Sequence, residues 1–198
     1  MARTPTEARS AELLRWAGSL GVFYILIPAW LIASEPLLAL LIPWQPPAIA
    51  ALLKIALAAL GALGIFLIAA SIRAQLTRGA GHPFDMTGRE SFSRPTQVLL
   101  TRGVYWWVRN PMGLGDILLY LAITGLTGSV RSMFINVPLY AAIVWWNHRF
   151  NERPALIRRF GEAYRAYERT TSCLLPGPRT TRKLLQRTSP RQGAPSES

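Results

Sequence analysis

Two long stretches nearly free of charge set the first limit on what this chain can be. One runs from Trp16 to Ser34, and the other runs from Ala48 to Ile72 with Lys54 near its first end. Each is close to the ~20 apolar residues that a helix needs to cross the hydrocarbon core of a bilayer. A lysine near a helix end can reach the headgroups. The pattern therefore predicts two membrane-spanning helices. A cleaved signal peptide is the alternative for the first stretch, but Pro28 fits its short apolar region poorly and no A-x-A-like site follows.

Two shorter apolar runs follow later in the chain. They cover Ile117–Val130 and Ser132–His148, and only Arg131 separates them, so Gly128–Ser132 is expected to form a tight turn within a helical hairpin. Counting this hairpin, we predict an all-α integral membrane protein with about four transmembrane helices. Between the first two spans, residues 37–47 contain or border four prolines and are expected to form a loop at the membrane interface.

The composition agrees with a membrane protein. Charged residues make up 16% of the chain and hydrophobic residues 51%, whereas ordinary soluble domains have about 25% charged residues. The single cysteine, Cys173, excludes an internal disulfide framework and a cysteine-rich metal site. His82 has no second histidine at ligand spacing, so no metal site is expected.

The basic residues indicate an orientation. The net charge is +12, and Lys54 and Arg131 alone among the 22 lysines and arginines lie outside three basic segments: the N-terminal segment, the central loop and the C-terminal region. Because cytoplasmic loops carry the excess of basic residues, both termini are expected in the cytoplasm, at a bacterial inner (plasma) membrane. The charge is then explained by topology and by contact with anionic membrane lipids, and nucleic-acid binding is not expected.

The chain divides into three parts. Residues 1–13 form a polar N-terminal segment, residues 14–176 one membrane domain, and residues 177–198 a basic tail that we expect to be disordered. At the end of the domain, apolar residues recur every three or four positions and predict an amphipathic helix on the cytoplasmic surface; they are Leu156, Phe160, Ala163, Tyr164 and Tyr167.

Two acidic residues stand near the ends of the predicted spans. Glu152 follows the last span, and from the residues alone a local ion pair with Arg149 or Arg153 is favoured over a functional role. Asp116 begins the third span, where capping of the helix is favoured over a pair with a loop arginine.

Several motifs together resemble the superfamily of isoprenylcysteine carboxyl methyltransferases and phospholipid methyltransferases. The resemblance runs from Gly81 to Pro176, about half of the chain. GHPFD resembles the loop that opens the family motif, LLTRGVYWWVRNP resembles its core, and the spacing E-x-x-x-L-x-x-x-F-G-x-x-Y-x-x-Y starts at Glu152. Several ordered matches are more specific than one short pattern.

The resemblance implies a cytoplasm-facing cavity for S-adenosylmethionine, open sideways to the bilayer so that a lipidic acceptor can enter. The positions that match the family's cofactor-binding motif are Gln97, Val98, Leu99, Leu100, Tyr105, Asn110, Pro111, Met112, Gly113 and Glu152. An arginine that holds the acceptor in the prenylcysteine enzymes corresponds to His148, with Arg149 one position later.

The expected function is therefore S-adenosylmethionine-dependent methyl transfer to a membrane-resident or hydrophobic acceptor: a carboxylate of the isoprenylcysteine type, a phospholipid amine or a thiol. Such transfer needs mainly positioning and exclusion of water, and no metal. A non-catalytic membrane protein that binds lipid or a partner is the main alternative, and an NADPH-dependent reductase-like relative is a further one. The chain departs from the family pattern at Gly113, Arg153, Ser172 and Cys173, and an altered substrate is the favoured explanation.

Overall fold

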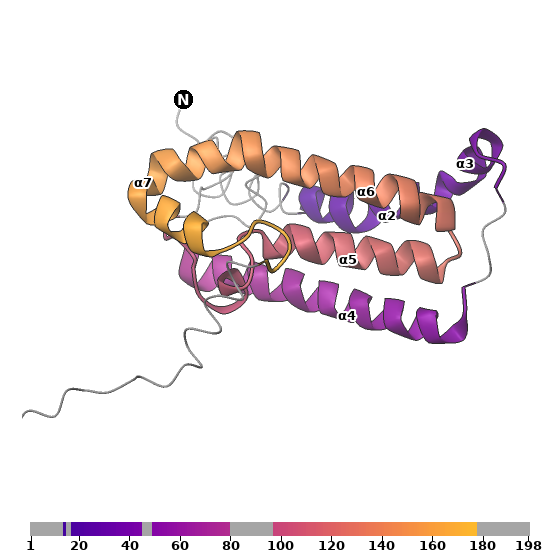
Figure 1. Cartoon of the computed structure of the whole chain (residues 1–198), viewed down its shortest axis with the longest axis horizontal. Helices are drawn as coiled ribbons and strands as arrows, with labels where there is room; N and C mark the ends of the chain where they lie inside the picture. The colour runs from indigo at the N-terminus through magenta and orange to yellow at the C-terminus, as the bar shows by residue number, and fades with distance from the viewer. Residues whose placement is uncertain (1–13, 15–16, 45–48, 80–96, 178–198) are drawn as a thin grey trace, which may run out of the picture.

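The computed structural model describes residue 14 and residues 17–44, 49–79 and 97–177. Within these ranges the regular structure is helical, apart from an isolated bridge between Val108 and Ser172, so the prediction of an all-α chain is confirmed there. Figure 1 shows α4, α5 and α6 side by side. The predicted polar segment 1–13 and the predicted disordered tail, except for Gly177, lie outside the described residues.

The helical elements include π-helical and 3-10 turns, which are labelled η. In chain order they are η1 (Val22–Leu26), α2 (Ile27–Ala33), α3 (Glu35–Leu41), α4 (Ala51–Ala74), η2 (Gln75–Gly79), η3 (Gly103–Trp106), α5 (Pro111–Leu126), α6 (Val130–Asn147), η4 (His148–Glu152) and α7 (Arg153–Thr170).

The first helical run, Ala17–Leu41, includes a segment for which the sequence predicted a loop. Residues 37–41 belong to α3, so the interfacial loop predicted over 37–47 is wrong in this part, and residues 45–48 lie outside the description. Pro36 stands in the first turn of α3, where a backbone N–H has no helical partner. The proline therefore starts this short helix instead of preventing it.

Two helical stretches in the described part are long and apolar enough to cross a membrane. They are Ala17–Leu41 and Ala51–Gly79, with mean hydropathies of 1.8 and 2.5. The apolar helix α5 has 16 residues, fewer than the ~20 that a perpendicular span requires. The hairpin of α5 and α6 exists, but its crossing of the membrane stays a prediction.

Small residues allow α4 and α5 to approach closely. A Cβ added at Gly64 of α4 would lie 2.6 Å from the carbonyl oxygen of Gly115 on α5. Farther along the same pair, a Cβ at Gly125 would lie 2.5 Å from Leu57 Cδ1. Helices in apolar surroundings commonly pack through small residues in this way. This close contact holds the first turns of α5 against α4. Residues of those turns line the cavity described below.

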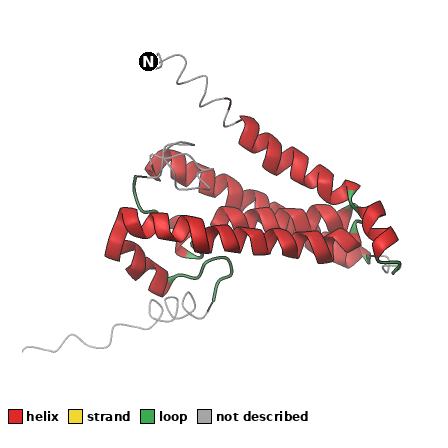
Figure 2. Ribbon diagram, turned by 90° about the horizontal axis from the view of Figure 1, so that it is seen from above, coloured by secondary structure: helices red, strands yellow, loops and turns green. Residues whose placement is uncertain are grey.

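The first helical run packs against α5 and α6 through a small core. Leu31 of α2, Tyr120 of α5 and Val137 of α6 are buried together, and the Tyr120 hydroxyl donates a hydrogen bond to the carbonyl of Phe23. Figure 2 shows this first run at an angle to the other long helices, with its N-terminal end apart from them.

The hairpin turn is shorter than the sequence predicted. It consists of residues 127–129, with Gly128 at φ +79°, and α6 already begins at Val130. Arg131 was expected in the turn, but it lies in the first turn of α6 and pairs with Glu35 at 3.0 Å. This ion pair attaches α3 to the start of α6.

The last helix is interrupted. Gly161 has φ +54° and ψ −128° inside α7, a conformation that residues with a side chain rarely adopt. The interruption turns the second half of α7 back toward the segment before α5. There Val108 pairs with Ser172, and the Asn110 N–H donates to the carbonyl of Cys173 at 2.9 Å. The two segments that carry the sequence motifs thus meet at one end of the bundle.

Candidate functional site

A cavity lies where these two segments meet. The space between its lining atoms, including the open mouth, is about 1180 Å³. Nine of the twelve predicted site residues line it: Val98, Leu99, Leu100, Tyr105, Asn110, Met112, Gly113, His148 and Glu152. Tyr105 and Glu152 lie almost fifty positions apart in the sequence, yet both line this cavity.

Three predicted site residues do not line the cavity. Gln97 is exposed and donates its backbone N–H to the carbonyl of Gly79 at 2.8 Å. Pro111 is fully buried in the first turn of α5. Arg149 is exposed, with its guanidinium 5.5 Å from the centre of the Phe150 ring. Of the two residues predicted on the acceptor side, His148 alone contributes to the cavity lining.

Three π-helical turns in the described residues supply cavity side chains. Phe23 comes from η1, Gln75 from η2, and His148 and Glu152 from η4. A π-turn carries an extra residue relative to the α-helix, which redirects the side chains that follow, and such turns are frequent at functional sites. The irregular helical turns therefore gather around the cavity.

The Glu152 carboxylate has two close partners from the end of α6. Asn147 Nδ2 donates to Oε1 at 2.9 Å, and His148 Nδ1 lies 2.9 Å from Oε2. The predicted local pair with Arg149 or Arg153 is wrong, because Arg153 is paired with Glu168 at 2.7 Å. Glu152 is therefore oriented by an amide and an imidazole within the cavity wall.

His148 connects Glu152 to Arg109. The Nε2 atom of its ring lies 3.5 Å from Arg109 Nη1. Because the Glu152 carboxylate accepts hydrogen bonds, the Nδ1–H group of the ring is assigned as the donor to it. The ring is 4% exposed, so these contacts fix its orientation.

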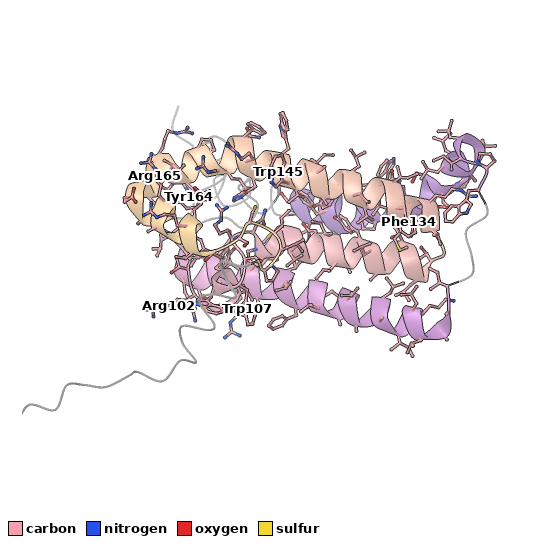
Figure 3. The ribbon with its side chains drawn as sticks, viewed as in Figure 1. Arg102, Trp107, Phe134, Trp145, Tyr164 and Arg165 are labelled. Carbon is pink, nitrogen blue, oxygen red and sulfur yellow. The ribbon has the colours of Figure 1, made fainter. Side chains whose placement is uncertain are left out.

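Arg109 also ties α7 to the segment before α5. Its Nη1 atom donates to the Tyr164 hydroxyl at 2.8 Å and to Glu168 at 2.9 Å. The hydrogen bond from Arg153, together with the charge of Arg109, holds the pKa of Glu168 below its ordinary value. Figure 3 shows Tyr164 at the end of the molecule where Arg102 and Trp107 also lie, far from Phe134 at the other end.

Tyr105 is buried where η3, to which it belongs, meets η2 and α7. Gln75 Nε2 of η2 donates to its hydroxyl at 2.7 Å, and Tyr167 of α7 donates to its backbone carbonyl. Burial raises the pKa of the Tyr105 hydroxyl to about 12. The side chain is therefore neutral at physiological pH, and its fixed aromatic ring forms part of the cavity lining.

Gly113 departs from the family pattern for a reason visible in the packing. A Cβ at this position would lie 2.7 Å from Val144 Cγ1 of α6 and 2.9 Å from the Asn110 side-chain nitrogen. Asn110 is the N-cap of α5, because its Oδ1 accepts from the Gly113 N–H at 2.9 Å. A side chain at position 113 would displace both the cap and α6.

Asp116 does not cap the helix as predicted. It lies inside α5 and is 5% exposed. Its oxygens accept hydrogen bonds from the Tyr24 hydroxyl at 3.2 Å and the Tyr140 hydroxyl at 3.0 Å. The capping prediction failed because the helix starts five residues earlier, at Pro111. Asp116 lines the cavity on the side of the apolar helices.

Sequence reasoning missed several lining residues. Gln75, Asp116, Tyr140 and Arg159 line the cavity but were not among the predicted site residues. A signal existed for Asp116, because an acidic residue inside an apolar stretch indicates function by default. Gln75 and Arg159 carry no such signal. His82 lies outside the described ranges, and within them no group of three or more His, Cys, Asp or Glu side chains could hold a metal ion.

Comparison with known proteins places most of the cavity within a known family. The model of the phospholipid methyltransferase family matches residues 53–163, just over half of the 198-residue chain. The matched region begins in α4 and ends in α7, so it contains every cavity-lining residue except Phe23, Tyr164 and Tyr167. No curated protein and no solved structure matches the chain.

Proposed function

Because the chain belongs to the phospholipid methyltransferase family, within the isoprenylcysteine carboxyl methyltransferase-like superfamily, we propose that it transfers a methyl group from S-adenosylmethionine to a membrane-resident or hydrophobic acceptor. The observation that carries this proposal is the convergence of Tyr105, Asn110 and Glu152 on one cavity. Tyr105 and Asn110 belong to the core motif of the family resemblance, and Glu152 begins its second motif.

The chemistry of the cavity lining fits such a cofactor. Leu99, Met112 and Val144 offer apolar contacts to a purine ring. The Glu152 carboxylate, already oriented by Asn147 and His148, can accept hydrogen bonds from hydroxyl or ammonium groups.

The remaining work of the site is positioning. When bound, S-adenosylmethionine supplies a methyl group on a positively charged sulfur. The contacts of Arg109 with Tyr164 and Glu168 hold α7 over the cavity, which would exclude water while the acceptor is in place. We assign the acceptor-side role to His148, because Arg149 is exposed and suited to contact with anionic headgroups.

The proposed topology has four spans, with α5 and α6 as the last two and both termini in the cytoplasm of a bacterial cell. Its support is the distribution of basic residues, of which only Lys54 and Arg131 fall on the opposite side. A tilted helix or a locally thinned bilayer accommodates the short α5. The cavity would then open at the cytoplasmic surface, where the cofactor is found.

The decisive experiment is isothermal titration of the full chain, purified in detergent, with S-adenosylhomocysteine. We expect micromolar binding, and Glu152→Ala should weaken it at least 100-fold because the cavity loses its oriented carboxylate. Glu162→Ala is the matched control, since Glu162 lies on α7 with 65% of its side chain exposed and outside the cavity lining. Its affinity should equal that of the unmodified protein.

Absence of binding by the folded protein would overturn the proposal and favour a non-catalytic role in binding lipid or a partner. Co-purification of NADPH in place of the sulfonium cofactor would favour the reductase-like alternative. Transfer of labelled methyl groups into lipid, small-thiol and prenylcysteine extracts, with Glu152→Ala as the negative control, then identifies the acceptor.

A further inference from the structure

A second carboxylate faces the cavity from inside the helical bundle. Asp116 is 5% exposed and receives one tyrosine hydroxyl on each oxygen, from Tyr24 of η1 and from Tyr140 of α6. Glu152, the other cavity carboxylate, comes from η4 beyond the end of α6. The cavity lining therefore carries one carboxylate beside the motif residues, Glu152, and one among the apolar helices, Asp116.

Asp116 differs from the other buried or half-buried carboxylates in lacking a basic partner. The ion pairs within the described ranges involve Glu35, Glu152, Glu162 and Glu168, and none involves Asp116. A charged carboxylate in apolar surroundings is costly, and two neutral hydroxyl donors offset only part of that cost. A group with a positive charge or N–H donors that entered the cavity would be attracted to this position.

We propose that Asp116 is the residue that receives the reacting nitrogen of the acceptor, takes a proton from it, and is positioned for this by Tyr24 and Tyr140. The inference rests on the proposed methyl transfer and narrows it, since it selects an amine on a hydrophobic carrier. A carboxylate or thiolate acceptor would place a second negative charge beside Asp116, which is unfavourable in a site of low dielectric.

The chemistry balances with groups already named. An ammonium has no lone pair with which to attack a carbon atom. The Asp116 carboxylate takes one N–H proton and leaves a neutral amine. The nitrogen lone pair then forms the C–N bond to the methyl carbon while the C–S bond breaks and its electrons stay on sulfur. The methylated nitrogen carries the positive charge, and the proton on Asp116 passes to water at the cavity mouth.

A test on the unmodified protein uses three probes with the same alkyl chain: dodecylamine, dodecanoate and dodecanethiol. Each is supplied in nanodiscs with labelled S-adenosylmethionine. We expect the amine to be methylated at least 100-fold faster than the other two. Faster methylation of the carboxylate or the thiol would overturn the role of Asp116. This comparison requires no variant and so does not depend on the folding of one.

The variant Asp116→Asn keeps the size of the side chain and removes its charge. With the amine probe at pH 7 we expect a rate at least 100-fold lower, while the affinity for S-adenosylhomocysteine stays within twofold. The deficit should shrink as the pH is raised toward about 10, because more of the amine is then neutral without help. Glu162→Gln, exposed on α7, is the control.

The outcomes separate the two proposals. A deficit of Asp116→Asn that is the same at every pH, or no deficit at all, would overturn the inference. Failure of the unmodified protein to bind S-adenosylhomocysteine would instead count against the proposed function. Retained binding, with methyl groups found on the carboxylate or thiol, would leave the proposed function intact and remove the role of Asp116 alone.

Discussion

A glutamate from a neighbouring element lies at each end of α6, and the two glutamates have different surroundings. At the N-terminal end, Glu35 accepts from Arg131 Nη1 at 3.0 Å and from the Ser132 N–H at 3.1 Å. At the C-terminal end, Glu152 meets Asn147 and His148 and also faces a cavity. Glu35 is paired with an arginine inside the protein, whereas Glu152 also faces a space that a ligand can enter.

The partners of each carboxylate indicate its role: Glu35 holds helices together, whereas Glu152 is placed to contact a ligand. Arg131 also donates to the carbonyl of Ile42 at 3.0 Å, so the Glu35 end joins α3, the segment after it and α6 into one unit. The interactions of Glu35 are internal to the protein. At the other end, Asn147 and His148 orient Glu152, and its remaining hydrogen-bonding capacity is available to a ligand.

Substitution at the Glu35 end should give the largest change in stability. Glu35→Gln removes a charged partner from Arg131 where the two side chains are 19% and 12% exposed. We expect a loss of about 2 kcal/mol, which lowers Tm by roughly 4–8 °C in a chain of this size. Thermal unfolding in detergent measures it.

The affinity of the remaining folded protein for S-adenosylhomocysteine should not change in Glu35→Gln. This is the reverse of the result expected for Glu152→Ala, in which binding is lost. Equal loss of binding in both variants would remove the distinction between the two ends of α6.

A smaller effect is expected from Glu168, which joins α7 to Arg109 and Arg153. Its pKa in the folded protein is lowered from the ordinary value of 4.5, first by the hydrogen bond from Arg153. The stabilisation is therefore present above about pH 4.5 and is lost as the pH falls through the lower, folded-state value. Tm should decrease between pH 5 and pH 3 by more in the unmodified protein than in Glu168→Gln.

Measured by scanning calorimetry, identical acid profiles for the two proteins would contradict this account. Glu162→Gln serves as the control, because its pairs with Arg165 and Arg169 are exposed and contribute little in water. Its profile should follow that of the unmodified protein.

The smallest effect is expected at Arg165, on the outer side of α7. Its side chain is 56% exposed and lies 3.8 Å from Glu162. Arg165→Ala should change stability by less than about 0.5 kcal/mol and leave methyl transfer nearly intact. Inactivation would mean that the face of α7 that serves the site has been assigned incorrectly. Figure 3 shows Arg165 and Tyr164 as neighbours on this helix.

Much of the candidate site could be predicted because its residues lie in short, ordered motifs. Tyr105 and Glu152 were chosen by the resemblance to the family, and both line the cavity. The partners of Glu152 could not be predicted. Four side chains, from Asn147, His148, Arg149 and Arg153, surround it in sequence, and the π-turn η4 decides which of them point toward it.

The helix boundaries explain the other differences. Residues 37–41 were expected in a loop because of the prolines, yet Pro36 falls where a helix tolerates it. Asp116 was expected at a helix start, yet α5 begins at Pro111 with Asn110 as its cap. A shift of a few residues turned a predicted capping group into a buried carboxylate in the cavity wall.

The sequence by itself determined the class of protein: uncharged stretches long enough to span a bilayer, a biased distribution of basic residues, and the motifs of a methyltransferase family. These properties depend on local composition and on order along the chain. Only the tertiary structure decided which charges are neutralised and which face the cavity. That choice depends on contacts such as Tyr24 with Asp116, 92 residues apart, because the cost of a buried charge is set by whatever the fold places beside it.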